Sequence, residues 1–93
     1  MLILSQNKKH IINTSQCTDI GIFTSYDDDD NKVAEIAAGT PTANIYNGGY
    51  RLLGQYDDES QALEILSEIF NSKGKFIMPD RTSLNFFKKV ETL

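Results

Sequence analysis

The stretch YRLLGQYDDESQALEILSEIFNSKG, Tyr50–Gly74, decides the fold, because it reads as a strand that leads directly into an amphipathic helix. Apolar residues recur at spacings of 1, 4, 7 and 8 from Ala62, which places them on one side of a helix. Asp58 is a good N-cap, and Gln61 three residues later can complete a capping box. Gly74 suits the end of the helix. We therefore expect a helix at about residues 58–73.

The rest of the chain has the pattern of short antiparallel strands separated by turn residues. Asn47-Gly48-Gly49 is the strongest turn signal, because Asn-Gly suits the two positive φ angles of a type I′ turn. The expected strands are residues 2–4, 11–12, 17–26, 32–38, 44–46 and 50–56, and residues 76–79 should be extended. The predicted fold class is α+β: an antiparallel β meander of about four to six strands with one amphipathic helix packed on one face.

Alternation assigns the faces of two strands. Ile20 and Ile22 should share one face of the first long strand, opposite Phe23. In the strand before the helix, Leu52 and Tyr56 should lie opposite Leu53. The core candidates are the apolar residues of these elements: Ile20, Ile22, Val33, Ile36, Leu53, Leu63, Leu66, Ile69 and Phe70.

Composition indicates a small soluble protein. The chain has 93 residues, a net charge of −4 and one cysteine, so no intramolecular disulfide can form. No apolar run is long enough to span a membrane, and the apolar start is too short for a signal peptide. We expect a cytoplasmic location.

Charge divides the chain into an acidic body and a basic end. Residues 1–72 carry a net charge of −7, whereas residues 73–93 carry +3. The expected organisation is a single α+β domain at residues 1–79, followed by a basic aromatic tail or short helix at residues 80–93. Adjacent phenylalanines in such a tail favour docking onto this domain or a neighbouring chain. The candidate interaction surface is Phe86, Phe87, Lys88 and Lys89.

The residues that could carry chemistry do not form a recognisable catalytic, cofactor or metal site. Asp27–Asp30 lack the alternating spacing and the glycine of a calcium loop, so a solvated turn is expected. The acids at residues 57–59 are explained by helix capping. His10 is expected to be exposed and Cys17 to be a small core residue. An enzyme would need both of them to converge with an acidic side chain in one cleft.

Three tyrosines, Tyr46, Tyr50 and Tyr56, have two interpretations. They can pack across neighbouring strands, or they can form an aromatic surface on which a base stacks. Packing within the sheet is the preferred interpretation.

The strand Leu52–Tyr56 and the helix after it resemble a type of small protein common in Gram-positive bacteria and their phages. There a strand of the form (I/L)LGxY leads into a helix of the form (D/S)xExxAxxxLxxI. The start of this chain, and the exit from the helix at residues 76–79, are also similar. The resemblance implies the fold and a bacterial or phage setting, and it implies no activity.

The sequence thus favours a non-catalytic cytoplasmic accessory or protein-interaction domain, with a phage or mobile-element origin in view. Its expected partner is another protein or a second copy of the chain, with no membrane, cofactor or small-molecule substrate. The alternative is a nucleic-acid-related role, in which the basic tail contacts DNA or the acidic body mimics DNA. Direct binding to nucleic acid is disfavoured, because phosphate neutralisation needs a basic surface.

Overall fold

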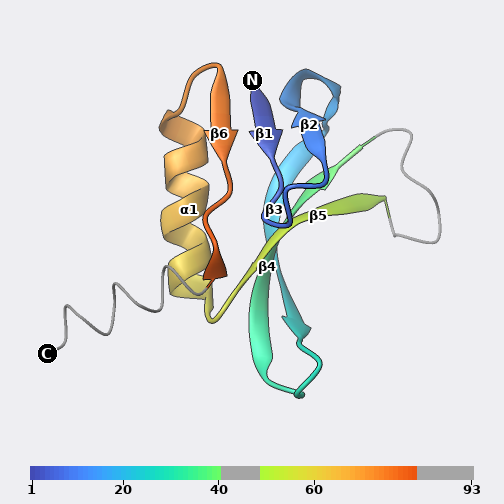
Figure 1. The fold of residues 1–93 in the computed structure, drawn as a ribbon, viewed down its shortest axis with the longest axis vertical. Coiled ribbons are helices and arrows are strands. Elements are labelled where there is room, and N and C mark those ends of the chain that lie inside the picture. Colours follow the sequence, from blue (N-terminus) through green and yellow to red (C-terminus); the bar gives the residue numbers. More distant parts are fainter. Residues whose placement is uncertain (41–48, 82–93) are drawn as a thin grey trace, which may run out of the picture.

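The computed structural model describes residues 1–40 and 49–81, which form six strands, one α-helix and a short 3₁₀-helix (Figure 1). The elements in chain order are β1 (Leu2–Leu4), β2 (Ile11–Asn13), η1 (Thr14–Gln16), β3 (Asp19–Tyr26), β4 (Lys32–Gly39), β5 (Tyr50–Tyr56), α1 (Glu59–Asn71) and β6 (Lys75–Ile77). The α+β prediction is confirmed. No helix in this described part combines the length and apolar character needed to cross a membrane.

The strands divide between two sheets of three. The strands β3, β4 and β5 form the predicted antiparallel meander, in that order. The second sheet has the order β2–β1–β6, in which β1 pairs antiparallel with β2 and parallel with β6. The predicted extended segment at residues 76–79 contributes to β6, and its parallel pairing with β1 is a feature that local patterning did not indicate. It forms because the helix returns the chain to the N-terminal strand (Figure 1).

The helix has the predicted cap. The carboxylate of Asp58 accepts a hydrogen bond of 2.8 Å from the backbone N–H of Gln61. The Gln61 side chain in turn accepts from the backbone N–H of Asp57 at 3.2 Å, so the reciprocal bond of the predicted capping box falls one residue before the N-cap. After the helix, Gly74 has a φ of +80°, a conformation that glycine adopts without strain.

The core lies between α1 and the two sheets. It contains Ile3, Ile12, Ala34, Ile36, Ala38, Leu53, Tyr56, Ala62, Ile65, Ile69 and Met78. Among the predicted core residues, Val33, Ile36, Leu53 and Ile69 are buried, and Ile20 and Ile22 pack against the core while partly exposed. Leu66 is half-buried.

Two helix residues were wrongly predicted as core. Leu63 is 52% exposed and Phe70 is 87% exposed. The apolar stripe of α1 covers about 160° of the helix circumference at 100° per residue, more than one contact can bury. The helix therefore presents Ala62, Ile65 and Ile69 to the core and leaves one edge of its stripe outside.

Leu53 and Tyr56 are both buried, although alternation placed them on opposite faces. The pairing of β4 with β5 shifts register by one residue between Ile36 and Ala37, which marks a bulge in β5. The extra residue reverses the alternation, so Leu53 and Tyr56 enter the same core and the opposite-face prediction for this pair is wrong.

The segment after β6 is tied to the domain. Met78 is fully buried, and its N–H donates to the carbonyl oxygen of Leu4 at 3.0 Å. The amide of Gln6 bridges this segment to β5, because its Nε2 donates to the carbonyl oxygens of Gln55 and Pro79, each at 3.1 Å. The predicted strand at residues 44–46, the Asn47-Gly48 turn and the tail beyond Arg81 lie outside the described residues.

Candidate functional site

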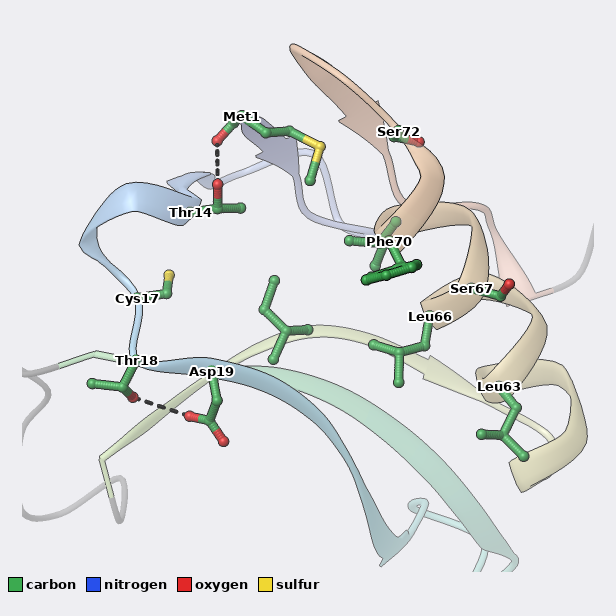
Figure 2. Close-up of a pocket in the computed structure, with 12 residues that line it drawn as sticks. Met1, Thr14, Cys17, Thr18, Asp19, Leu63, Leu66, Ser67, Phe70 and Ser72 are labelled. Atoms are coloured by element: carbon green, nitrogen blue, oxygen red, sulfur yellow. Dashed lines mark hydrogen bonds between the residues drawn. The ribbon is translucent and has the colours of Figure 1, made fainter.

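An open groove separates the exposed edge of α1 from β3 (Figure 2). Its volume is about 700 Å³. Leu63, Leu66 and Phe70 line the helix side, and the opposite side includes Cys17 and Ile20. In Figure 2 Leu66 points from the helix into the space beside β3, and Leu63 lies on the helix side of the groove. The groove exists because the helix turns only part of its apolar stripe into the core.

The lining of the groove is mainly apolar. An exposed phenylalanine two helical turns from an exposed leucine, on the same side of the helix, costs solubility, so such a pair needs an explanation. Hydroxyl groups of Thr14, Thr18, Ser67 and Ser72 also line the groove. Those of Thr14, Thr18 and Ser72 donate to Met1, Asp19 and Glu68, so toward a ligand they act as acceptors. An apolar centre with a polar rim is the arrangement of a protein-interaction surface.

The charges along the groove have one sign. Among the described residues, Asp19 of β3 is the acidic side chain that lines the groove, and neither α1 nor β3 has a lysine, arginine or histidine; Glu64 and Glu68 project from the outer side of α1. Glu59 lies four residues before Leu63, which places it on the same side of the helix. The groove is therefore complementary to a ligand that combines apolar groups with positive charge.

His10 and Cys17 line a second, smaller cleft, which also includes Asn13 and Arg51 and, among residues 1–40 and 49–81, no carboxylate. The thiol of Cys17 lies 3.5 Å from the carbonyl oxygen of Asn13, to which it donates. Burial, and secondarily the carboxylate of Asp19, raise the pKa of Cys17, so the thiol stays protonated at neutral pH. The geometry brings the two residues together without activating the nucleophile. His10 is exposed, as predicted.

The Asp27–Asp30 loop is organised by its own backbone. The Asp27 carboxylate accepts from the N–H groups of Asp29 and Asn31 at 3.0 and 2.9 Å, and these bonds, the one from Asn31 first, lower the pKa of Asp27. This is the geometry of a turn, as the sequence indicated. Within residues 1–40 and 49–81, no group of three His, Cys, Asp or Glu side chains is arranged to hold a metal ion.

Arg81 connects this loop to the start of the helix. Its Nε donates to the Asp57 carboxylate at 2.5 Å, and its other nitrogens reach Gln55 at 3.2 Å and Asp27 at 3.4 Å. The bond to Asp57 is the main cause that raises the pKa of Arg81. The guanidinium thus already has two carboxylate partners. Sequence reasoning treated Arg81 as part of a free basic tail and missed this pairing, since Asp27 is 54 residues away.

A second apolar surface covers the outer side of the small sheet. Its members are Leu2, Leu4, Ile11 and Ile77, and the last three form one row across β1, β2 and β6. Ile11 is 67% exposed and Ile77 is 62% exposed. This aliphatic row contains no aromatic or acidic side chain, which distinguishes it from the groove.

The predicted interaction residues Phe86, Phe87, Lys88 and Lys89 lie beyond the described residues, as does Tyr46. Tyr56 is buried in the core, and Tyr50 packs edge-to-face against Phe23 with ring centroids 4.7 Å apart. Tyr50 thus packs within the sheet, against a ring two strands away, whereas Tyr56 packs into the core between the sheets and the helix.

One feature of the sequence could have predicted the groove residues. The apolar stripe of α1 is too wide for the whole of it to be buried against the sheets. Comparison with known proteins adds no further indication: no protein-family model, no curated protein and no solved structure matches this chain.

Proposed function

We propose that this protein is a non-catalytic cytoplasmic interaction domain whose α1–β3 groove binds an apolar, positively charged segment of a protein partner. The observation that carries the proposal is the exposure of Leu63 and Phe70 on an acidic helix beside a preformed groove. Helix-lined grooves of this kind take amphipathic segments, which insert apolar side chains at regular spacing. The Gram-positive or phage setting implied by the sequence resemblance belongs to the same proposal.

The chemistry of the described residues supports a binding role over a catalytic one. The cleft that holds His10 and Cys17 lacks a carboxylate to orient the imidazole, and the pKa of the thiol is raised. A nucleophilic cysteine needs the opposite shift.

Selection from a displayed random peptide library, with the full chain as bait, tests the proposal. We expect enriched peptides to combine aromatic or aliphatic residues with lysine or arginine. Phe70→Ser should weaken their binding roughly tenfold or more, as loss of a central apolar anchor does. Ile11→Ser, which removes another largely exposed apolar side chain on the small sheet, is the matched control and should bind as the wild type does. Absence of enrichment, or equal binding by Phe70→Ser, would overturn the proposal.

A second copy of the chain is the alternative partner, and the aliphatic row on the small sheet favours it. Two such faces can meet around a twofold axis, since the row carries no like charges that would repel. Sedimentation of the wild type at micromolar concentration tests this alternative. A dimer that Ile11→Asp dissociates would support it, whereas a monomer at every concentration would remove it.

The nucleic-acid alternative receives less support. Arg81 already pairs with Asp57 and Asp27, and the described side chains that line the groove include Asp19 and no lysine or arginine. A salt-dependent gel shift that is lost in Lys88→Glu/Lys89→Glu would nevertheless establish contact between the tail and DNA.

A further inference from the structure

We infer that residues 82–93 of this chain dock into the α1–β3 groove of the same molecule and compete there with the partner segment. This inference rests on the proposed interaction groove and names its regulation. Four observations support it: the place where the described chain ends, the length of the segment beyond, its apolar content and its charge.

The starting point of the segment is held beside the first turn of α1. Arg81 is bonded to Asp57, the residue that immediately precedes the N-cap Asp58. The groove begins within the next two turns, at Leu63, and continues along the helix to Phe70 and Ser72. The remainder of the chain therefore departs from one end of the helix that forms the groove wall.

The segment is long enough to reach every part of the groove. Twelve residues follow Arg81. Their maximum reach is about 40 Å at 3.3–3.6 Å per residue, whereas a helix of the length of α1 extends about 20 Å. Even a path around the end of the helix leaves residues to spare.

The composition of the segment matches the groove. It reads TSLNFFKKVETL, with five apolar side chains, the adjacent pair Phe86-Phe87 and the adjacent pair Lys88-Lys89. The phenylalanines suit the exposed leucine and phenylalanine of the helix wall. The lysines suit Asp19, which lines the groove, and Glu59, which lies on the groove side of α1. The aliphatic row on the small sheet has no acid to offer, so the groove is the better complement.

The protein carries a natural reporter for this contact. Cys17 is the single cysteine of the chain and lines the groove opposite the helix (Figure 2). A docked segment should slow its alkylation by iodoacetamide in the folded full-length protein. Rates are to be measured over a range of pH and compared as thiolate rate constants, because only the thiolate reacts.

We expect Phe86→Ser/Phe87→Ser to increase the rate constant roughly tenfold, a ratio equivalent to about 1.4 kcal/mol of docking free energy. Lys88→Glu/Lys89→Glu, a second variant that keeps both rings, should increase it in a salt-dependent manner. Asn85→Ser is the matched control in the same segment and should leave it unchanged. An unchanged rate in both of the first two variants would overturn the inference.

Leu63→Ser tests the groove side of the contact. In Figure 2 Leu63 and Cys17 lie on opposite sides of the groove, so this change does not itself uncover the thiol. It should accelerate alkylation, and adding Leu63→Ser to the phenylalanine variant should produce no further increase, because both act on one contact. Additive effects would count against docking.

Concentration and location distinguish the other occupants. Protection that disappears on dilution would assign the groove to the tail of a second copy and overturn docking within one chain. Methyl NMR shifts can be compared between the wild type and Phe86→Ser/Phe87→Ser. Differences at Leu4 and Ile11, instead of at Leu63 and Leu66, would place the tail on the small sheet. Neither result depends on the peptide selection, so the inference and the proposed function can fail separately.

Discussion

The hydroxyl of Tyr56 donates a hydrogen bond of 2.9 Å to the carbonyl oxygen of Pro79. Tyr56 is fully buried at the end of β5, and Pro79 lies in the segment that follows β6. One side chain therefore links the β3–β4–β5 sheet to the chain exit, which Met78 and Gln6 also secure. The starting point of the tail depends on this arrangement.

Removal of this hydroxyl should destabilise the protein without altering the fold. We expect Tyr56→Phe to lower the free energy of unfolding by about 1 kcal/mol, because one hydrogen bond is lost while the Pro79 carbonyl keeps its bond from Gln6. Urea denaturation measures the change. Tyr26→Phe is the control, since Tyr26 is 66% exposed, and it should stay within about 0.5 kcal/mol of the wild type. Equal effects of the two substitutions would contradict the structural role of the Tyr56 hydroxyl.

The same residue predicts how stability changes in alkali. Burial, and secondarily the charge of Asp80, raise the pKa of Tyr56 above its ordinary value of 10.0. A group whose pKa is higher when folded contributes its full stability below the unfolded pKa and loses it as pH rises toward the folded value. Above pH 10 the free energy of unfolding of the wild type should therefore fall by up to about 1.4 kcal/mol per pH unit. Tyr56→Phe should not show this loss. Parallel stability curves for the two proteins above pH 10 would refute the shift.

Gly54 makes room for the buried ring. A Cβ at this position would lie 2.7 Å from the Tyr56 hydroxyl oxygen and 2.9 Å from a ring carbon. Gly54→Ala should therefore cost about 1–3 kcal/mol, the usual range for overpacking a core. Gly21→Ala is the matched strand control, because its Cβ would meet Phe23 at an ordinary 3.7 Å. Thermal or urea unfolding checks both, and a neutral Gly54→Ala would show that the ring can move.

Two adjacent residues of α1 differ sharply in burial, one lying in the core and the other exposed at the groove. Ile69 is 5% exposed and Phe70 is 87% exposed. We expect Ile69→Ala to cost about 2–4 kcal/mol of stability through the cavity it leaves. Phe70→Ser should change stability by less than about 0.5 kcal/mol, which makes it a clean probe of binding. A large loss of stability in Phe70→Ser would show that the ring belongs to the core and would withdraw it from the binding surface.

The helix, its cap and the meander were predictable because their causes are local. Asp58, Gln61 and Gly74 act on backbone groups within a few residues, and the alternation of β3 needs no distant contact. The faces of β5 were not predictable, since the bulge opposite Ile36 and Ala37 exists only when β4 and β5 pair. The pairing of Arg81 with Asp27 likewise joins residues that only the fold brings together.

The amphipathic stretch from Tyr50 to Gly74 by itself determined that this protein has one capped helix after a strand, because hydrogen bonding and apolar spacing act along the chain. Only the tertiary structure decided which edge of that helix is buried. The sheets can cover about half of a stripe that is 160° wide, so packing turned Ala62, Ile65 and Ile69 inward. The same packing left Leu63 and Phe70 to form a groove. The candidate site is thus the edge of the apolar stripe of α1 that the two sheets do not cover.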